Sequence, residues 1–225
     1  MTVLVFGATG ALGSSIVSEL TSEGSRVVRI SRKPGEFSDV SLINKNWVNE
    51  VKEFGPITGV VWAQGVNSAG TVPDINLQDL RDAFEANVVF IVETLSKLVE
   101  SDCLPFGTRC VVLSSIWQEH ARPNKLAYIA SKAALSGLVP ALAIDLASRG
   151  ISINGVLPGV IDTPMTRANL STTQIQNVEL STPTSKLAKP EDVSRAVAWL
   201  VNDKSTGITG QWITVDNGWA VYRNV

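Results

Sequence analysis

The sequence has few of the residues that build metal sites, disulfide scaffolds and histidine-based catalytic triads. It contains one histidine, His120, and two cysteines, Cys103 and Cys110. No Cys/His cluster has zinc-ligand spacing, so no metal site is predicted, and two cysteines do not form a disulfide framework. A Ser-His-Asp triad would need His120 as its general base. Because His120 lies in a loop-like stretch, we interpret it as an exposed loop residue or, at most, a substrate contact.

The chain also lacks long apolar runs and concentrated charge of either sign. Its 19 basic and 21 acidic residues leave a net charge of -2, and the basic residues are scattered. This pattern contains no stripe that would bind nucleic acid or a membrane. No segment reaches the roughly 18 apolar residues of a spanning helix, and no basic leader with a cleavage site precedes the first apolar stretch. We therefore expect a cytoplasmic protein whose partner is a small molecule rather than a nucleic acid or a membrane.

Short β-branched runs alternate with longer helical patterns along the 225 residues. Several of the short runs are continuously apolar, which suits a parallel sheet buried on both faces. The alternation predicts one α/β domain over residues 1–225, with a three-layer, doubly wound parallel sheet. Strands are predicted at residues 2–6, 26–31, 58–63, 109–114, 151–157 and 211–215, and helices at about 11–23, 41–53, 77–100, 126–148 and 190–202.

One segment interrupts this alternation. Residues 163–186 are polar and rich in threonine and serine, and sheet elements resume after them. We interpret this segment as a mobile lid over a site rather than a linker. Apolar side chains in and near it either form a wall of a substrate site or pack in the core or an interface. They are Met165, Leu170, Ile175, Val178 and Leu180 in the segment, and Val66 and Trp117 outside it.

A glycine-rich turn follows the first predicted strand and opens the first helix. Its sequence, V-F-G-A-T-G-A-L-G-S, has glycines in the spacing G-x-x-G-x-x-G. Such glycines would let the backbone approach a pyrophosphate, whose charge would face the unpaired N–H groups of the helix. The usual dinucleotide spacing is G-x-G-x-x-G, so a glycine turn without a ligand is the alternative. The predicted cofactor contacts are Gly7, Thr9, Gly10, Ala11, Leu12 and Gly13.

The end of the second predicted strand bears on which nicotinamide cofactor is bound. A carboxylate there would bind the ribose 2′-hydroxyl of NAD, whereas Ser31, Arg32 and Lys33 offer a hydroxyl and two cations. We predict NADP(H) in preference to NAD(H), with Ser31 and Arg32 as contacts. The alternative is a solvated basic turn. Asp39 and Val40 lie several residues further on and could flank the adenine ring.

A tyrosine and a lysine lie four residues apart in the alanine-rich stretch A-Y-I-A-S-K-A-A-L, residues 127–135. In a helix this spacing brings the Lys132 ammonium near the Tyr128 oxygen, where it would lower the phenol pKa from about 10. Such a pair could exchange a proton near neutral pH. The alternative is a half-buried tyrosine beside a solvated lysine. Pro140 in the same predicted helix should kink it beyond Lys132.

Taken in order, these and other motifs resemble the short-chain dehydrogenase/reductase family over nearly the whole chain. The resemblance implies a Rossmann fold and reversible hydride transfer between a nicotinamide cofactor and a carbonyl or secondary alcohol, with a 3-oxoacyl thioester or a small ketone among the possible substrates. Besides the glycine turn and the Tyr128–Lys132 pair, it is carried by E-A-N-V-V-F, V-V-L-S-S-I, N-G-V-L-P-G-V-I-D-T-P-M, K-P-E-D-V-S-R-A-V-A-W-L and I-T-G-Q-W-I-T-V-D-N-G-W.

The resemblance also implies roles for single residues. Tyr128 would be the general acid and base, and Ser115, thirteen residues earlier, would hold the substrate oxygen, with Ser114 as the neighbouring candidate. Lys132 would tune Tyr128 and bind the nicotinamide ribose, and Asn87 would position a water chain. A homodimer or homotetramer through the helices at 77–100 and 126–148 is implied as well. The further cofactor contacts would be Ala63, Gly65, Asn87, Tyr128, Lys132, Pro158, Gly159, Ile161 and Thr163.

One motif departs from the family. Where the family commonly has N-N-A-G, this chain has W-A-Q-G at residues 62–65. Gly65 still permits close approach to the adenine ribose, whereas the roles of Trp62 and Gln64 stay open. Two other functions also stay open: a non-catalytic NADP(H)-binding regulator, and a lyase or epimerase that uses the nicotinamide transiently.

Overall fold

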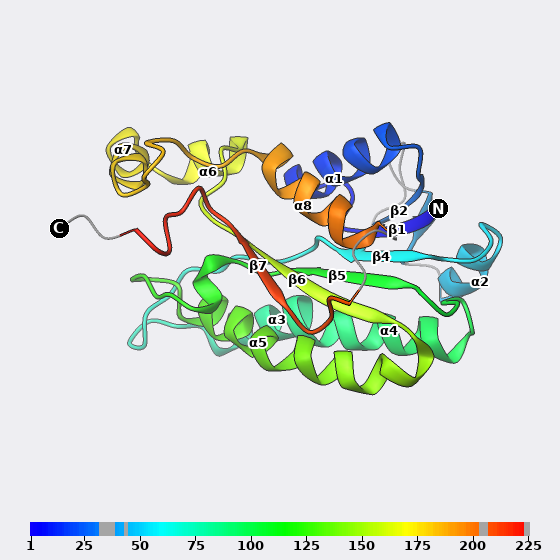
Figure 1. The fold of residues 1–225 in the computed structure, drawn as a ribbon. Coiled ribbons are helices and arrows are strands. Elements are labelled where there is room, and N and C mark those ends of the chain that lie inside the picture. The colour runs from blue at the N-terminus through cyan, green and yellow to red at the C-terminus, as the bar shows by residue number, and fades with distance from the viewer. Residues whose placement is uncertain (32–38, 43–44, 203–206, 223–225) are drawn as a thin grey trace.

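A seven-stranded parallel sheet lies between two layers of helices (Figure 1). The computed structural model describes residues 1–31, 39–42, 45–202 and 207–222. The strand order is β3-β2-β1-β4-β5-β6-β7, and every neighbouring pair is parallel. The predicted three-layer, doubly wound sheet is therefore confirmed. The strands are β1 Thr2–Phe6, β2 Arg26–Ser31, β3 Val40–Ser41, β4 Gly59–Trp62, β5 Arg109–Leu113, β6 Ser152–Pro158 and β7 Trp212–Val215.

Two hydrophobic clusters, one on each face, hold the sheet between its helices. In β1, Leu4 and Phe6 enter one cluster, and Val3 and Val5 enter the other. Both sets are fully buried, which is why the strand reads as a continuous apolar run. The longer helices are α1 Ala11–Ser22, α3 Leu77–Phe84, α4 Phe90–Glu100, α5 Leu126–Leu146 and α8 Pro190–Val201. In Figure 1, α1 and α8 cover one face, and α3, α4 and α5 cover the other.

The order of the strands locates a crevice for ligands. From β1 the chain winds outward to β2 and β3, and then returns to place β4 on the other side of β1. At such a reversal the connections leave in opposite directions, so a gap opens beyond the carboxyl ends of β1 and β4. The glycine turn follows β1 there, and residues 63–65 follow β4.

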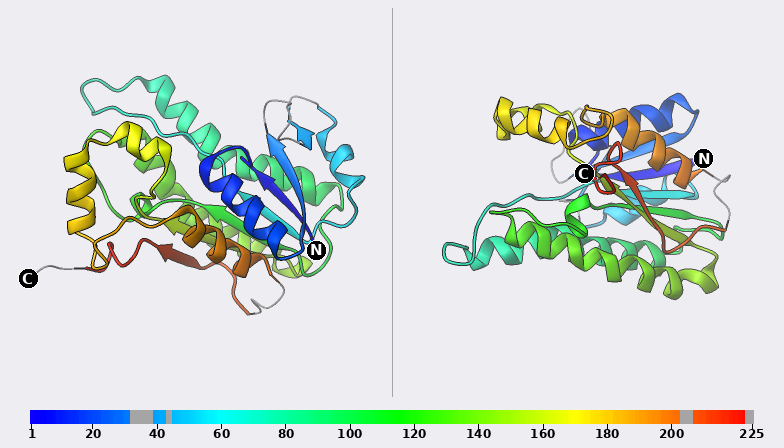
Figure 2. Two further views of the ribbon diagram at one scale, coloured as in Figure 1. Left: turned by 90° about the horizontal axis from the view of Figure 1, so that it is seen from above. Right: turned by 60° about the vertical axis from the view of Figure 1, so that its left-hand side comes forward.

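Three predicted segments differ from the structure. The helix predicted at 41–53 is wrong at its start, because Val40 and Ser41 pair with Ile30 and Ser31 as β3 and only Trp47–Lys52 forms α2. The helix predicted at 77–100 contains a π-helical turn, Glu85–Val89, between α3 and α4. The segment at 163–186 contains two short helices, α6 Pro164–Asn169 and α7 Thr172–Leu180, at the carboxyl-end edge of the sheet (Figure 2).

The α5 helix runs through Pro140 without a break. By length and composition alone, residues Leu126–Arg149 would qualify as a membrane-crossing helix, although no such segment was expected from the sequence. In this fold the helix packs beside the sheet, with Ser131, Lys132 and Leu135 buried. Its apolar composition therefore serves the packing of the domain at this face.

Candidate active site

The glycine turn combines tight packing with open space. A Cβ on Gly7, whose φ is +76°, would lie 2.6 Å from the backbone nitrogen of Gln64, and one on Gly13 would collide with the Gly7 carbonyl oxygen. These two glycines are therefore required by the fold itself. At Gly10 the nearest atom to a Cβ would be the Gly7 oxygen, 3.5 Å away. The space next to Gly10 is left free for a ligand.

The amino end of α1 is suited to an anion. Gly10 is its N-cap, no side chain caps the helix, and its first turn carries no acidic residue. The unpaired N–H groups and the positive end of the helix dipole therefore face the open space. A cavity of about 450 Å³ lies beside them, and its lining includes Ala11, Ser14, Ser15 and Thr163. Two predicted cofactor contacts, Ala11 and Thr163, thus border one cavity.

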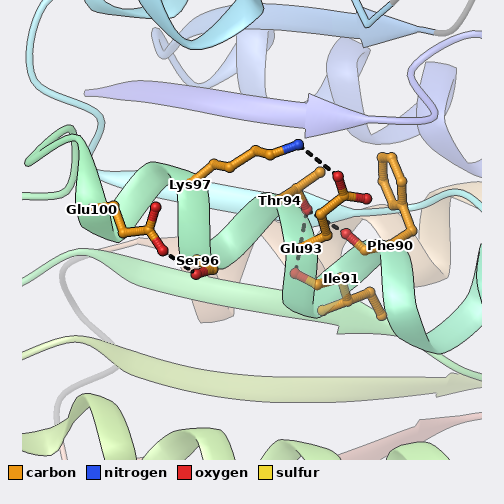
Figure 3. A network of polar contacts seen from close by, with 7 residues as sticks. All are labelled: Phe90, Ile91, Glu93, Thr94, Ser96, Lys97 and Glu100. Atoms are coloured by element: carbon orange, nitrogen blue, oxygen red, sulfur yellow. Dashed lines mark hydrogen bonds and ion pairs between the residues drawn. The ribbon is translucent and has the colours of Figure 1, made fainter. Parts of the chain in front are cut away.

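Trp62 does not reach the crevice. Its ring stacks on Phe6 with centroids 5.8 Å apart and an interplanar angle of 8°, and it is fully buried. Its indole Nε1 donates a hydrogen bond of 2.9 Å to Thr94 Oγ1. Thr94 in turn donates to the carbonyl of Phe90 at 2.7 Å, as Figure 3 shows. Trp62 is therefore a core residue, and its ring does not supply the amide of the asparagine that the family commonly has at this position.

Asn87 holds the chain after β4 against α5. It lies in the π-helical turn, a feature often found at functional sites. Its Oδ1 accepts from the Val66 backbone N–H at 2.9 Å, and its Nδ2 donates to the Val66 carbonyl at 3.2 Å and to Ser131 Oγ at 2.9 Å. Ser131 then donates to the carbonyl of Tyr128 at 2.9 Å. No motif in the sequence indicates this bridging role of Ser131.

Gly65 lies at the meeting point of these groups. A Cβ at Gly65 would lie 3.0 Å from Asn87 Oδ1 and 3.5 Å from Lys132 Nζ. Any larger side chain would fill the space beside both polar groups. The structure thus brings residues from the β4 end, the π-helical turn and α5 to one place.

Tyr128 and Lys132 lie on the same side of α5. Lys132 Nζ lies 6.0 Å from the centre of the Tyr128 ring and donates to the Leu113 carbonyl at 3.0 Å. The Ser115 side chain hydrogen-bonds to the Tyr128 phenol, and its Oγ also accepts from the Trp117 backbone N–H at 3.3 Å. Ser115, Tyr128 and Lys132 therefore form one cluster.

The neighbouring serine has no such contact. The buried Oγ of Ser114 has no hydrogen-bond partner among the described residues. The thirteen-residue spacing to Tyr128 and the hydrogen bond therefore favour the same serine, Ser115.

The pKa values of this cluster differ from the expectation. Burial raises the pKa of the Tyr128 phenol, and the hydrogen bond from Ser115 only partly offsets it. Burial also lowers the pKa of the Lys132 ammonium to about 8. The expected lowering of the phenol pKa by Lys132 is therefore wrong for this structure, because burial raises the phenol pKa and the ammonium is bonded to the Leu113 carbonyl instead.

The adenine side of the crevice is partly described. Ser31 is buried at the end of β2, and Arg32 and Lys33 lie outside the described residues. Asp39 receives two hydrogen bonds from the Arg29 guanidinium, at 3.1 and 2.8 Å, which hold its carboxyl pKa below the usual value. Val40 is buried in the core. Its side chain is therefore not placed to flank an adenine ring.

The segment after β6 lies beside the glycine turn and α6. A Cβ on Gly159 would lie 2.7 Å from the Asp216 Cβ, so Gly159 lets the chain ends of β6 and β7 pack closely. Ile161 is buried and bridges to Ala188, which leaves only its backbone for a ligand. Thr163 caps α6 by accepting from the Thr166 N–H at 3.1 Å. Pro158 ends β6 in register with Val215.

The segment 163–186 does not supply core residues. None of its five apolar side chains named above is buried, and Met165 and Leu180 are 66% and 73% exposed. Core packing is thus excluded for them, whereas a substrate wall or an interface remains. At its start, Arg167 binds the Asp162 carboxylate through two hydrogen bonds of 2.6 and 2.7 Å.

A cluster of aromatic rings follows Ser115 in the chain. Trp117 packs edge-on against Trp219 with centroids 5.6 Å apart, and His120 packs on Trp219 at 5.5 Å. The Arg122 guanidinium lies 5.5 Å from the Trp117 ring centre. His120 is half-buried rather than an exposed loop residue. Within the described part of the chain, no group of three His, Cys, Asp or Glu side chains is placed to hold a metal ion.

Comparison with known proteins places the chain in a family. The family described as enoyl-(acyl carrier protein) reductase matches residues 39–220. A 3beta-hydroxysteroid dehydrogenase of Mediterraneibacter gnavus is 28% identical, with 98% of this chain and 95% of that protein aligned. A 3-oxoacyl-[acyl-carrier-protein] reductase FabG of Staphylococcus epidermidis is 29% identical over 96% of this chain and 97% of that protein.

Solved structures agree with these matches. The aldohexose dehydrogenase AldT of Thermoplasma acidophilum superimposes with a TM-score of 0.86 at 25% identity, covering 100% of this chain and 95% of that one. A short chain dehydrogenase family protein of Francisella tularensis shares the fold with a TM-score of 0.85 at 24% identity, covering 98% of this chain and 99% of that one. This chain belongs to the short-chain dehydrogenase/reductase family, whose members are oxidoreductases that use a nicotinamide cofactor.

Proposed function

We propose that this protein is an NADP(H)-dependent oxidoreductase that transfers hydride reversibly between a nicotinamide and a carbonyl or secondary alcohol. The observation that carries this proposal is the hydrogen-bonded contact of Ser115 with Tyr128 beside the buried Lys132. A phenol with a neighbouring hydroxyl and cation suits proton transfer to an oxygen that gains negative charge.

In the proposed mechanism, Tyr128 is the general acid of carbonyl reduction and the general base of the reverse reaction. Ser115 hydrogen-bonds the substrate oxygen, and Lys132, which is anchored to the Leu113 carbonyl, binds the nicotinamide ribose. When bound, the nicotinamide supplies or accepts the hydride. Asn87 acts by positioning, because Val66 and Ser131 already engage both ends of its amide. The water chain that the family resemblance implies at Asn87 stays a prediction.

The residues present fit a dinucleotide. The uncapped amino end of α1 and the open space at Gly10 suit a pyrophosphate, and the Lys132 ammonium beside Gly65 suits ribose hydroxyls. We propose the backbone of residues 7–13, with Thr9, Ala11 and Leu12, as the pyrophosphate contact. Ala63, Gly65, Pro158, Gly159, Ile161 and Thr163 would line the path toward the nicotinamide.

The proposed preference for NADP(H) depends on the end of β2. Ser31 and Arg32 are the proposed contacts of the 2′-phosphate. The carboxylate of Asp39 is neutralised by Arg29, so it would not repel this phosphate strongly. The ratio of kcat/KM for NADPH and NADH tests the preference, and equal values would contradict it.

A small ketone or a 3-oxoacyl thioester is the proposed substrate. Trp117 follows Ser115 by two residues and would form one wall of the carbonyl site, and α6 and α7 would act as a lid. A panel of such carbonyl compounds, assayed with NADPH and with NADH by nicotinamide absorbance, tests reaction and substrate together. At least one compound should oxidise NADPH. Tight cofactor binding with no turnover would favour a regulator, and turnover with no net absorbance change would favour a lyase or epimerase.

A homodimer or homotetramer is proposed from the surface of α4, α5 and the π-helical turn. Val89, Val92 and Ile144 are 44%, 40% and 78% exposed on this helical layer. Exposed apolar side chains on long helices suit contact with a second copy. Light scattering after size-exclusion chromatography measures the mass, and a 24.1 kDa monomer at micromolar concentration would contradict the proposal. A cytoplasmic location stays a prediction.

A further inference from the structure

The side-chain amide of Gln64 is an exception among the polar groups around the crevice. Its Nε2 and Oε1 are both shielded from solvent, and neither has a hydrogen-bond partner among the described residues. Buried amides are almost always paired, because an unpaired one loses its hydrogen bonds to water on folding. Nearby polar groups are paired: Trp62 Nε1 binds Thr94, and the Asn87 amide binds Val66 and Ser131. Of the Trp62, Gln64 and Asn87 side chains, only the Gln64 amide has no hydrogen-bond partner among the described residues.

Gln64 lies between the two parts of the proposed cofactor site. On one side, its backbone nitrogen and Cα are 2.6 and 2.8 Å from the position that a Cβ on Gly7 would take. On the other side, its neighbour Gly65 adjoins Asn87 Oδ1 and Lys132 Nζ. It follows the carboxyl end of β4, beside the carboxyl end of β1 where the strand order reverses. The residue thus sits next to both the glycine turn and Lys132.

The chemistry of a carboxamide narrows what could pair with it. The amide offers two N–H donors and one carbonyl acceptor. A pyrophosphate only accepts hydrogen bonds, so it would leave Oε1 unpaired. A ribose diol both donates and accepts, so it can satisfy Nε2 and Oε1 together. In NADP(H) the nicotinamide ribose keeps both hydroxyls, whereas the adenosine ribose carries the phosphate at its 2′ position and keeps only its 3′-hydroxyl, which can still donate and accept.

We propose that the Gln64 side chain is an additional cofactor contact that binds ribose hydroxyls of the dinucleotide. This inference rests on the proposed function, and it assigns a role to one of the residues that depart from the family's N-N-A-G motif. The unpaired amide is then a ligand-binding group that the fold keeps available between Gly7 and Lys132.

Gln64→Leu tests the inference through binding and stability rather than turnover. Calorimetric titration with NADPH and with ADP-ribose should give a Kd that is roughly five- to tenfold higher than that of the wild type. The melting temperature without ligand should stay the same or rise, because the variant removes an unpaired buried amide. Gln64→Met is the second variant, because its unbranched side chain is closer in shape to glutamine than leucine is. It should show the same higher Kd and the same unchanged or higher melting temperature.

Titration with ADP distinguishes the two riboses. If the variants have a higher Kd for ADP as well as for ADP-ribose, Gln64 binds the adenosine ribose. If their Kd is higher only for ADP-ribose and NADPH, Gln64 binds the ribose on the other side of the pyrophosphate. Both results support the proposal. Gln118→Leu is the matched control, because its buried amide is also unpaired among the described residues. It should leave the Kd for ADP-ribose unchanged.

Unchanged Kd values in both Gln64 variants would overturn the inference and leave the amide as a structural group, hydrated by internal water. A large drop in the ligand-free melting temperature of both variants would overturn it too, because the amide would then be needed for folding. Failure of the wild type to bind any dinucleotide is a different result, since it would overturn the proposed function itself.

Discussion

The Lys132 ammonium donates a 3.0 Å hydrogen bond to the carbonyl of Leu113, and it lies 6.0 Å from the centre of the Tyr128 ring. The lysine is therefore anchored to the end of β5 rather than to the phenol. Since the ring and the ammonium still lie on one side of α5, the proposed proton donor and the cation are separate groups of one cluster. The two can be tested independently.

Replacing Tyr128 tests the proton donor. Tyr128→Phe keeps the ring and its packing but removes the hydroxyl that contacts Ser115. We expect kcat for carbonyl reduction to fall by roughly 100-fold to 1000-fold, with an unchanged Kd for NADPH. Tyr222→Phe removes the hydroxyl of the only other tyrosine and should keep full activity. Activity near the wild-type level in Tyr128→Phe would rule out the assignment.

Replacing Lys132 tests its lowered pKa. The folded-state pKa of about 8 lies below the ordinary value of 10.5, so the unfolded chain binds more protons between these two pH values. The free energy of unfolding must then rise with pH in this window. Lys132→Met has no amine to titrate. Between pH 7 and pH 9.5 the free energy of unfolding of the wild type should therefore rise by about 2 kcal/mol relative to that of this variant. Urea unfolding at several pH values measures this difference. A difference that does not change with pH would contradict the lowered pKa of the buried ammonium.

The fold could be predicted because its strands are buried on both faces. Residues such as Val3, Leu4, Val5 and Phe6 enter two clusters in turn, so the whole strand reads as apolar. Two-residue β3 has no periodicity to recognise, since only pairing with β2 defines it. The π-helical turn at Asn87 also leaves no local signal, because it forms where the turn and α3 pack against α5.

The clustering of the candidate site residues was predictable, but the electrostatics of the cluster were not. Helical spacing alone brought Tyr128 and Lys132 to one side of α5. Spacing does not report how much solvent is removed, and that desolvation determines both pKa directions. The unpaired amide of Gln64 is equally invisible in the sequence, because hydrogen-bond partners are set by the packed structure.

Removing the Asn87 amide tests its positioning role. Asn87→Ala deletes its hydrogen bonds to Val66 and Ser131, so we expect the free energy of unfolding to fall by about 2 to 3 kcal/mol. Ser131→Ala should cost less, and the double variant should cost less than the sum, since the two share one bond. Urea unfolding of the three variants measures the coupling. Fully additive costs would contradict the bridge, and Asn169→Ala, an exposed amide bonded only to Met165, is the control.

The glycine turn offers a pair of substitutions with opposite expected results. In Gly13→Ala the new methyl group meets the Gly7 carbonyl oxygen, a backbone atom that cannot move aside. This variant should lose about 1 to 3 kcal/mol of stability. In Gly10→Ala the methyl group has room, and the φ of -74° is allowed for alanine, so stability should be kept.

The same Gly10→Ala methyl group occupies the space proposed for the pyrophosphate at the start of α1. Its Kd for NADPH should therefore rise on the order of tenfold, although its fold is intact. Thermal unfolding and calorimetric titration of both variants separate the two effects. If Gly10→Ala bound NADPH as tightly as the wild type, the pyrophosphate would have to lie away from this turn, and the contacts proposed at residues 7–13 would be wrong.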